Sequence, residues 1–487
     1  MASEQGGHLG PGSTGRNRAI VVGAGPNGLA GAIALARAGM EVTVLEANDQ
    51  PGGGARSAEL TVPGVLHDTC SAVHPFGAAS PFFRELRLEE HGLRWRYPAV
   101  DVAHPLPGGR AGVLLQSIDE TLRRLPDDDR EPWGKLFGPL VEHYDELADE
   151  IFRPILHVPR HPVPMARFGL SALRSATSLA KRWQRPETKA LFAGIAAHAI
   201  HPLEKPTTAG VGVMFVVTGH AYGFPVPEGG SQSITAALCS VLASHGGVVE
   251  TGVRVRSPDE LPPAEVVLLD LAPRGVLELA GDQLPSRTAK AYRRFEHGPA
   301  AYKVDLAVEG GVPWENEDCR RAGTVHVGGP IEELAAAERE VHRGSMPGNP
   351  FVLVAQQYLV DPQRSKGDVH PVWAYAHVPN GFTGDATETV IGQIERFAPG
   401  FRERIVATHV RTPAQIEADN PNYVGGDIAT GAATPMQVVF RPKRGLNPYA
   451  TGIPGIYICS AATPPGGGVH GMGGANAAAS ALRSRKG

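Results

Sequence analysis

A glycine turn near the N-terminus constrains this chain more than any other feature. The run "AIVV" at 19–22 predicts a short buried strand, and "GLAGAIALARAGM" predicts a buried helix. Between them, "GAGPNG" places glycines at 23, 25 and 28, and a second strand, "EVTVLE", follows. In such a βαβ unit Gly23 permits the tight turn, Gly25 lets the backbone approach a pyrophosphate, and Gly28 lets helix and strand pack closely. The opening therefore predicts a dinucleotide-binding turn.

Two features downstream extend this nucleotide site. Glu46 ends the second strand, 18 residues after Gly28. A carboxylate there accepts hydrogen bonds from the hydroxyls of an adenosine ribose and repels a 2′-phosphate. The next loop, "ANDQPGGGARS", contains Gly53, Gly54 and Arg56. Its backbone N–H groups and the guanidinium are available to the phosphates.

The C-terminal stretch "GIYICSAATPPGGGVHGMGGANAAASAL" repeats the glycine spacing at Gly466, Gly468 and Gly471. Two interpretations are open: a second dinucleotide site, or the other half of the first. Only 16 residues follow Gly471, and they contain neither a strand nor an acidic residue, so a complete second unit does not fit. We therefore expect the N–H groups and the helix N-terminus of this stretch to face an electron-rich group such as a reduced flavin.

The rest of the chain predicts further structure. At 487 residues it is long enough for two or three domains. The residues between 119 and 197 are mostly of helical pattern. The runs "AYKVDLAVEG", "TVHVGG", "FVLVAQQYLV" and "VWAYAHVP" predict a second, mostly antiparallel sheet.

Composition limits the partners. Lys and Arg total 46 against 50 Asp and Glu, a net charge of −4, so the chain as a whole offers no basic surplus for nucleic acid. The four cysteines lie far apart, without zinc spacing. No signal peptide or apolar run of membrane-spanning length is evident. We expect a cytoplasmic protein without a metal, and the sequence leaves loose attachment to a membrane surface and the oligomeric state open.

Together with "VPEGGSQSI" before a helix and "TGVRV", these motifs resemble the phytoene-desaturase-related branch of the FAD-dependent amine-oxidase-like flavoproteins. The resemblance runs from about residue 18 to 484 and implies an α/β fold: a Rossmann-like three-layer FAD-binding domain with an inserted α+β substrate domain. It implies noncovalent FAD and oxidation by hydride transfer. The expected division is a disordered tail (1–17), an FAD-binding domain (18–105, 225–284 and 415–487) and a substrate-binding domain (106–224 and 285–414).

The resemblance also assigns cofactor contacts within the three glycine-rich segments and at two further positions. They are Gly23, Gly25, Gly28, Glu46, Gly53, Gly54, Arg56, Val253, Ser460, Gly467, Gly468, Val469, His470 and Met472. Two positions depart from the family pattern. Gly54 stands where the family commonly has Arg, with Arg56 as its substitute, and Ser460 stands where Asp or Gly often follows the strand.

Flavin oxidation sometimes needs a base, and histidine titrates near neutral pH. His470, inside the C-terminal glycine turn, and His74, after the second glycine loop, are the catalytic candidates, each with a packing role as its alternative. His220 and Tyr222 are candidates for lining the substrate cavity. Lys303 and Asp305 alternate on one strand face and predict a structural ion pair.

Three hypotheses for function follow. The first is an FAD-dependent dehydrogenase, desaturase or oxidase that removes hydride from a C–C or C–N bond of a largely apolar organic substrate. Because a second nucleotide unit is absent from the sequence pattern, dioxygen, a quinone or another carrier is the expected electron acceptor. The alternatives are a redox-neutral flavin-dependent isomerase and, in another class, a non-catalytic escort protein on the same fold.

Overall fold

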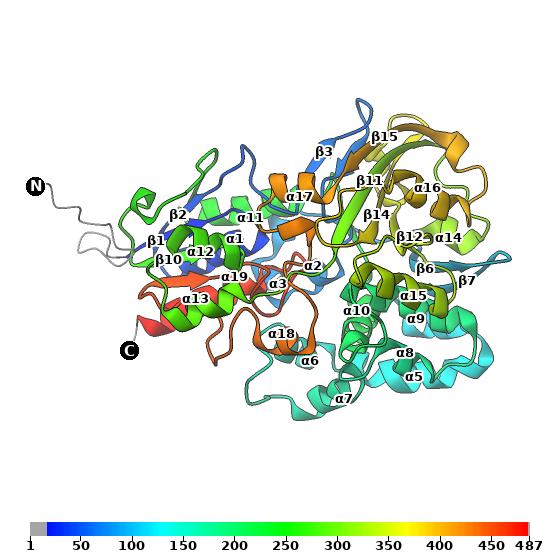
Figure 1. Ribbon diagram of the computed structural model, residues 1–487, viewed down its shortest axis with the longest axis horizontal. Coiled ribbons are helices and arrows are strands. Elements are labelled where there is room, and N and C mark those ends of the chain that lie inside the picture. Colours follow the sequence, from blue (N-terminus) through cyan, green and yellow to red (C-terminus); the bar gives the residue numbers. More distant parts are fainter. Residues whose placement is uncertain (1–16, 486–487) are drawn as a thin grey trace, which may run out of the picture.

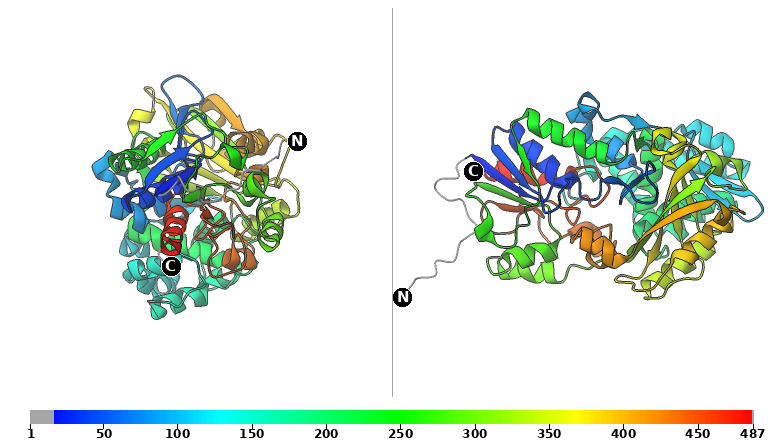
Figure 2. Two further views of the ribbon diagram at one scale, coloured as in Figure 1. Left: turned by 90° about the vertical axis from the view of Figure 1, so that its left-hand side faces the viewer. Right: turned by 90° about the horizontal axis from the view of Figure 1, so that it is seen from above.

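The computed structural model describes residues 17–485, which form two sheet-containing units lying side by side (Figure 1). The tail expected over residues 1–17 lies outside the described residues, apart from Asn17. One unit is built on a five-stranded sheet. The other combines a seven-stranded sheet with a layer of helices (Figure 2).

The five-stranded sheet is parallel throughout, in the order β16-β10-β1-β2-β9. Its strands are β1 (Arg18–Val22), β2 (Glu41–Leu45), β9 (Val248–Glu250), β10 (Val266–Leu269) and β16 (Ile456–Ile458). Val22 pairs in register with Leu45 on one side and with Leu269 on the other. The carboxyl ends of these strands therefore meet at one edge, where open α/β sheets bind their ligands.

Helices cover both faces of this sheet. One face carries α1 (Pro26–Arg37), α11 (Gln232–Ser244) and α19 (Met472–Ser484), and the other carries α12 (Pro273–Ala280) and α13 (Ser286–Arg293) (Figure 2). Successive residues of β1 point to opposite faces of the sheet. Val21 packs with the first set of helices and Ile20 packs with the second. The predicted Rossmann-like three-layer arrangement is confirmed.

The larger sheet has the order β15-β11-β14-β13-β12-β6-β7. Its strands are β6 (Val100–Leu106), β7 (Arg110–Leu114), β11 (Ala300–Glu309), β12 (Ala322–Val327), β13 (Val352–Ala355), β14 (Val369–Val378) and β15 (Ile405–Arg411). Neighbouring described strands are antiparallel except β6 and β12. The mostly antiparallel second sheet is therefore confirmed. Two short ribbons join β3 (Ser57–Glu59) with β4 (Leu66–Asp68) and β5 (Trp95–Arg96) with β8 (Val226–Pro227).

The helical layer of the second unit forms mostly within the predicted stretch 119–197, and α10 extends the layer beyond that stretch. It contains α4 (Ile118–Arg124), α5 (Asp127–Glu142), α6 (Tyr144–Ile151), α7 (Pro162–Ala172), α8 (Ala176–Ala180), α9 (Pro186–Ala196) and α10 (Thr208–Tyr222). Its core includes the fully buried rings of Trp133, Trp183 and Phe192, which pack close to one another. On the large sheet, α15 (Ile331–His342) packs in the same cluster as these helices, whereas α16 (Thr387–Glu395) packs in the cluster on the opposite face.

The remaining helical segments are short. They are α2 (Pro75–Ala79), α3 (Pro81–Leu86), α14 (Glu317–Arg321), α17 (Pro413–Asp419), α18 (Pro435–Phe440), and the 3-10 turns η1 (Leu88–His91), η2 (Ala197–Ala199), η3 (Pro258–Glu260), η4 (Gln357–Leu359), η5 (Pro362–Arg364), η6 (Arg402–Arg404) and η7 (Val424–Gly426).

Two expected domain boundaries differ from the packing. The boundary at residue 105 falls inside β6, which pairs with β7 and β12 in the large sheet. The boundary at residue 284 leaves out α13, whose Ala289 and Tyr292 pack with α12 on the five-stranded sheet. The chain therefore enters the second unit before Val100 and again after α13, because hydrogen bonding and burial, rather than changes of sequence pattern, define the units.

Candidate active site

The N-terminal glycine turn has the close packing that the sequence predicts. Gly23 has a φ of +100°, a conformation open to glycine. A Cβ on Gly28 would overlap the carbonyl oxygen of Gly23, and one on Gly25 would lie 2.7 Å from Oδ2 of Asp270. The helix α1 begins directly after the turn at Pro26. The turn thus brings the N-terminus of α1 to the carboxyl edge of the sheet.

Glu46 is buried at the end of β2 and faces this turn. Its Oε2 accepts a hydrogen bond of 2.7 Å from the N–H of Ala24, and its Oε1 accepts one of 2.9 Å from the N–H of Asn48. Oε1 also accepts from Nδ2 of Asn48 at 3.1 Å, so Oε2 is the oxygen that keeps a further lone pair for a ribose hydroxyl. The N–H of Val253, a predicted cofactor contact, donates to the carbonyl of Glu46 at 2.8 Å, which holds this segment against the end of β2.

The second glycine loop lies against the first. A Cβ on Gly53 would approach Cα of Gly25 to 3.2 Å, and one on Gly54 would overlap the hydroxyl of Tyr423. Arg56 donates to the carbonyl of Gly53 at 3.0 Å and pairs with Asp419. The guanidinium therefore fastens this loop to α17, in addition to any contact with phosphates.

The C-terminal glycine stretch joins the same place from the opposite end of the chain. A Cβ on Gly474 would overlap the carbonyl of Asn27, and one on Gly471 would lie 2.7 Å from Cβ of Ala30. Both of these contacts are with α1. The close approach of α19 to α1 places the stretch beside the first turn, as expected for the two halves of one site.

The turn before α19 holds several predicted contacts. Gly468 has a φ of +136°, and Val469 has a φ of +53°, an unfavourable value for a β-branched residue. Ser460 donates from Oγ to the carbonyl of Leu271 at 2.8 Å, so its hydroxyl secures the end of β16. A Cβ added to Gly467 would lie 3.5 Å from the carbonyl oxygen of Ala429. Met472 lines a cleft outside the turn.

These loops fit a dinucleotide cofactor such as FAD. Three backbone segments that tolerate almost no added Cβ converge at the N-termini of α1 and α19. The positive helix ends suit a pyrophosphate at α1 and an electron-rich ring at α19. The residues that would hold the group are those of the two N-terminal loops with Glu46, and the turn from Gly466 to Met472.

The two histidines predicted for catalysis are buried and close to these loops. Nδ1 of His470 accepts from the N–H of Met472 at 3.1 Å, and its ring also bonds to the backbone of Gly466 and Gly467. Nε2 of His74 lies 2.8 Å from Oγ of Ser231. Burial lowers the pKa of each imidazole to about 4, so both are neutral at neutral pH. Their catalytic role stays a prediction, and the hydrogen bonds give each a positioning role.

His220 and Tyr222 lie at the end of α10, away from the glycine loops. Nδ1 of His220 bonds to the carbonyl of Leu115, while Nε2 accepts from the indole of Trp133 at 3.2 Å. Tyr222 donates to Asp145 at 3.2 Å. Neither residue lines the small cavity beside the second glycine loop or the cleft beside Met472. The structure places them within the helical layer and at its surface, so their predicted role as substrate-lining residues stays without structural support.

The small cavity beside the second glycine loop has a volume of about 10 Å³. It is lined by Gly53, Thr69, Cys70, Ala301, Lys303, Trp373, Tyr375, Arg411, Ile416, Asp419, Tyr423 and Ile428. The ammonium of Lys303 pairs with Asp305 and stands 5.4 Å from the ring centre of Trp373. The predicted ion pair is therefore present, and it also borders the cavity. Burial lowers the pKa of Lys303, although Asp305 opposes that change.

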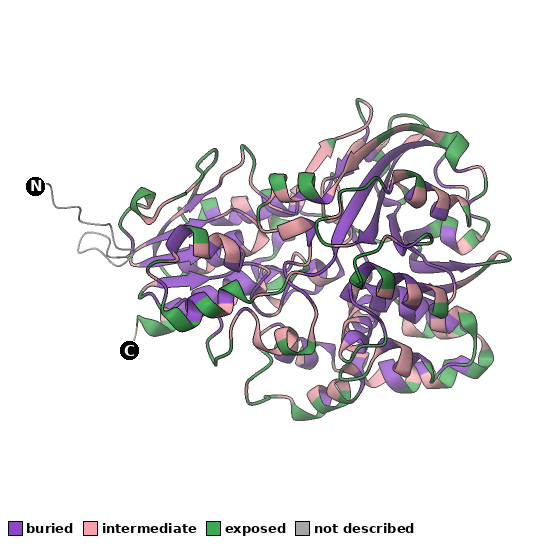
Figure 3. Ribbon diagram, in the orientation of Figure 1, coloured by how far each residue is buried: buried purple, intermediate pink, exposed green. Residues whose placement is uncertain are grey.

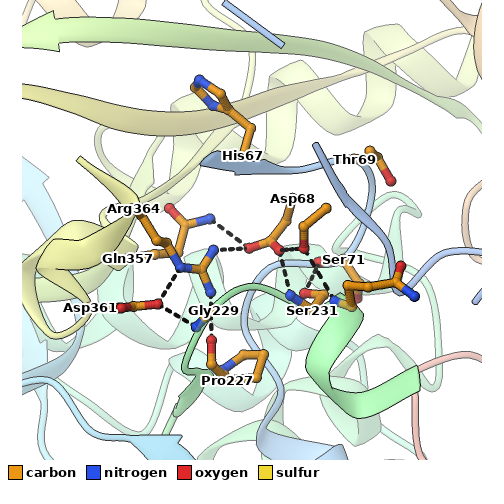
Figure 4. A network of polar contacts seen from close by, with 12 residues as sticks. His67, Asp68, Thr69, Ser71, Pro227, Gly229, Ser231, Gln357, Asp361 and Arg364 are labelled. Atoms are coloured by element: carbon orange, nitrogen blue, oxygen red, sulfur yellow. Dashed lines mark hydrogen bonds and ion pairs between the residues drawn. The ribbon is translucent and has the colours of Figure 1, made fainter. Parts of the chain in front are cut away.

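A buried polar network lies next to this cavity and joins β4 to segments from other parts of the chain (Figure 4). Asp68, at the end of β4, accepts from Arg364 at 2.6 Å and from the N–H of Ser231 at 2.6 Å. Arg364 also donates to Asp361 and to the carbonyl of Pro227. Burial favours the neutral acid, yet Arg364 and the N–H of Ser231 hold the pKa of Asp68 below its usual value. The "VPEGGSQSI" motif thus anchors the strand that leads to Cys70.

Sequence reasoning missed two charged residues at the glycine loops. Asp270 follows β10 and meets the N-terminus of α1, and its only sequence signal is its place directly after the "AEVVLL" strand. Arg441 lies beside the C-terminal turn, where a Cβ on Gly466 would approach its Nη1 to 2.8 Å. No local pattern identifies Arg441, because the contact joins a loop to a turn 25 residues away.

Comparisons with known proteins agree with this architecture. A family model described as an NAD(P)-binding Rossmann-like domain matches residues 21–86. The chain is 23% identical to pyridine nucleotide-disulfide oxidoreductase domain-containing protein 2 of Rattus norvegicus, over 96% of this chain and 94% of that protein. It is also 23% identical to a lycopene-forming phytoene desaturase of Paracoccus sp., over 96% and 97% of the two chains.

The fold is likewise shared with solved oxidoreductase structures. Putrescine oxidase bound to putrescine superposes with a TM-score of 0.59 at 18% identity, covering 96% of this chain and 99% of that one. Within residues 17–485, helices are too short or too polar to cross a membrane. The chain is therefore similar over nearly its whole length to a pyridine nucleotide-disulfide oxidoreductase domain protein and to a phytoene desaturase, and it shares its fold with putrescine oxidase.

Proposed function

We propose that this protein binds FAD noncovalently and removes hydride from a C–C or C–N bond of a largely apolar organic substrate. The observation that carries the proposal is the convergence of three glycine segments, centred on Gly25, Gly53 and Gly471, at the N-termini of α1 and α19. Bound FAD would supply the hydride acceptor. The chain's own contribution is to bind it, exclude water and manage the accompanying proton.

Noncovalent binding is supported by the side chains nearest the loops. Cys70 lines the cavity, but burial raises the pKa of its thiol, which disfavours the nucleophilic thiolate. His74 is held by Ser231. The four cysteines are unpaired, which supports a reducing compartment such as the cytoplasm.

Lys303 is the titratable group best placed to hold the substrate's proton. It borders the cavity, and burial lowers the pKa of its ammonium, which favours the neutral amine that a base requires. Asp305 would stabilise the ammonium once the proton arrives. The neighbouring Trp373, Tyr375, Ile416 and Ile428 supply apolar and aromatic surface, which favours an apolar substrate.

The electron acceptor that we propose is dioxygen, a quinone or another carrier. The C-terminal glycine stretch lies against α1, which supports one shared cofactor site over a second nucleotide site. Two relatives, a phytoene desaturase and a component of limonene dehydrogenase, are named for apolar substrates. The isomerase alternative is kept because the fold is shared with reduced UDP-galactopyranose mutase, at a TM-score of 0.58 and 13% identity. The escort alternative is set aside because the relatives are oxidoreductases.

Anaerobic mixing tests the proposal. The purified holoprotein is mixed with a panel of apolar alkenes and amines, and flavin absorbance and product are followed together. One flavin reduced per substrate oxidised supports the proposal, and reoxidation by dioxygen or a quinone then identifies the acceptor. Conversion of substrate by pre-reduced protein without net electron transfer would establish the isomerase instead. Protein that retains no flavin after gel filtration rejects both.

A further inference from the structure

A chain of ring contacts runs from the C-terminal glycine turn to the small cavity beside the second glycine loop. At the turn, a Cβ on Gly468 would lie 3.0 Å from the ring of Phe76, whose centre is 4.5 Å from that of Phe215. At the cavity, the ring of Tyr375 lies 5.6 Å, centre to centre, from that of His377. The rings between Phe215 and His377 are those of His198, His326 and Phe351, with consecutive centres 4.4–5.6 Å apart. These rings therefore connect two parts of the candidate site.

The ring chain lies between the helical layer and the large sheet. Phe215 belongs to α10, His326 to β12 and His377 to β14, and β14 is buried from Pro371 to Val378 (Figure 3). The adjoining cavity, at about 10 Å³, is about the size that one water needs. A larger ligand therefore enters by parting side chains of separate elements, which is a common adjustment on binding.

Three buried side chains in this region keep polar atoms unpaired. Nδ1 of His326, Nε2 of His377 and Oε2 of Glu338 have no hydrogen-bond partner among residues 17–485. Their other polar atoms are paired: Nε2 of His326 lies 3.0 Å from Nε2 of His198, and Nδ1 of His377 lies 2.7 Å from Oε1 of Glu338. Because a buried polar atom without a partner costs free energy, this histidine–glutamate cluster (His198, His326, His377 and Glu338) is incomplete without a further polar group.

The free atoms of the cluster are mainly acceptors. A carboxylate accepts only, so Nδ1 of His377 donates to Glu338, and the tautomer that this bond fixes leaves a lone pair on Nε2. Oε2 of Glu338 is a second acceptor, and among the described residues its carboxylate pairs with His377 rather than with a Lys or Arg. Burial lowers the pKa of His198 to about 3 and that of His326 well below its usual value, so this neighbouring pair is neutral at neutral pH. The cluster therefore favours a group that donates an N–H or O–H.

The backbone beside His198 is strained. His198 lies in η2, which ends at Ile200, whose φ of +47° is unfavourable for a β-branched residue. Such a conformation persists only where the surrounding structure imposes it, and it is concentrated at binding and catalytic sites. The strained turn holds His198 against Phe215 and His326, next to the unpaired atoms.

We propose that the histidine–glutamate cluster is a substrate subsite, which receives a hydroxyl or amine group at the end of the substrate remote from the bond that is oxidised. This subsite rests on the proposed function, since the same substrate gives up its hydride at the glycine loops. It narrows the substrate from any apolar molecule to one whose apolar chain ends in a donor group. The rings of Phe215, Phe351 and Tyr375 would pack along the chain, and Glu338 and His377 would accept from its end. A hydrocarbon would leave both acceptors unpaired.

Calorimetric titration of the holoprotein tests the subsite without turnover. The ligands are n-heptanol, its isomer hexyl methyl ether, and n-heptylamine. The alcohol and the ether bury similar apolar area, but only the alcohol and the amine donate a hydrogen bond. At least one of the two donors should bind about tenfold more tightly than the ether, because a hydrogen bond to a charged acceptor is worth roughly that factor or more. The donor that gains more identifies the end group as neutral or cationic.

Glu338→Gln should abolish that preference. Glutamine has the shape of glutamate and its oxygen can still accept from His377, but its NH₂ group would stand where Oε2 accepts. His377→Phe with Glu338→Met removes both polar partners together, so neither is left buried and alone. This double variant should also lose the preference while it binds the ether as before. Glu332→Gln, exposed on the same helix, is the control and should keep the preference, and thermal melting checks that each variant is folded.

The subsite is overturned if neither donor binds more tightly than the ether, or if the preference survives in both altered proteins, since the cluster would then be a hydrated part of the core. An equal loss of ether and donor binding in both altered proteins would likewise overturn it, because packing rather than hydrogen bonding would have changed. Flavin reduction distinguishes this failure from failure of the proposed function. Absence of the preference in protein whose flavin is reduced by apolar substrates rejects the subsite alone, whereas a donor preference in protein whose flavin stays oxidised with every substrate rejects the redox proposal alone.

Discussion

Oδ2 of Asp270 accepts a hydrogen bond of 3.0 Å from the N–H of Gly28, in the first turn of α1. This N-terminus is also where the phosphates of a dinucleotide bind in a Rossmann-like unit. Burial raises the pKa of Asp270 to about 7, even though the N–H of Gly28 stabilises its charge, and the nearby Glu46 adds to the rise. The acid is therefore poised to change charge in the physiological range.

Asp270→Asn should remove a pH-dependent loss of stability. Between about pH 4 and 7 the acid ionises in the unfolded chain but keeps its proton in the folded one, so the free energy of unfolding falls as pH rises through this window. The variant should have a flatter dependence and be more stable at pH 8, by on the order of a few kcal/mol. Melting midpoints at pH 5 and 8 measure this. The exposed Asp282→Asn is the control, and identical profiles for both variants would contradict the expectation.

Asp270→Asn should also strengthen FAD binding at pH 8. The variant takes away a negative charge beside the pyrophosphate, while the amide oxygen can still accept from Gly28. We expect roughly tenfold tighter binding at pH 8 and little change at pH 5, where the acid is already protonated. Titration of flavin-free protein with FAD at the two pH values measures the difference. Equal affinities at pH 8 would show that the carboxyl turns away when the cofactor binds.

Glu46→Gln should release FAD. The two carboxylate oxygens of Glu46 accept from the N–H groups of Ala24 and Asn48. In the variant, the NH₂ group of the glutamine would replace one of these oxygens, so one backbone N–H would face another hydrogen-bond donor. Losing charge-assisted hydrogen bonds of about 1.5–3 kcal/mol should weaken binding by roughly tenfold to a hundredfold. The ratio of FAD to protein after gel filtration measures it. Glu41→Gln, exposed at the other end of β2, should leave the ratio unchanged.

The sequence predicts the fold best where local chemistry decides it. The turn at Gly23, the strand that ends before Glu46 and the alternating strands of the large sheet are readable because glycine conformation and side-chain period act over a few residues. Counting residues after Gly471 also indicated that the C-terminal stretch completes the first site. Its contact with Ala30 bears out the expected adjacency.

Long-range contacts are what the sequence could not reveal. Asp270 meets Gly28 across 242 residues, and Arg364 meets Asp68 across 296. Neither pair shares a motif, and their proximity exists only after the sheets assemble. The boundary expected at residue 105 falls inside β6, and local sequence does not reveal that this strand pairs with β7 and β12.

Arg364→Met should destabilise the protein markedly. The change leaves the buried carboxylates of Asp68 and Asp361 without their shared cation. Removing one partner of a buried pair costs about 3–5 kcal/mol, so the melting midpoint should fall by several degrees. Combining Arg364→Met with Asp68→Asn should recover part of the loss. Arg343→Met, on the exposed end of α15, is the control, and an equal fall in both single variants would contradict the role of the network.

Lys303→Met should slow substrate oxidation and also destabilise the fold, because Asp305 would be left buried and unpaired. Lys303→Met with Asp305→Asn removes both charges and should regain most of the melting temperature. If Lys303 holds the substrate's proton, the double variant stays slow although it is stable. Anaerobic reduction rates across pH separate the two effects, and a stable double variant with the original rate and pH profile would leave the lysine with a structural role alone.

His470→Ala should keep FAD but alter the rate of flavin reduction. The imidazole accepts from the N–H of Met472 and bonds to the backbone of Gly466 and Gly467, so its loss loosens the turn before α19. His470→Asn distinguishes positioning from proton transfer, since its side-chain oxygen can still accept from Met472. A rate restored by Asn indicates positioning, whereas equally slow Ala and Asn variants indicate a base. Reduction rates that match the unaltered protein in both variants would remove His470 from the mechanism.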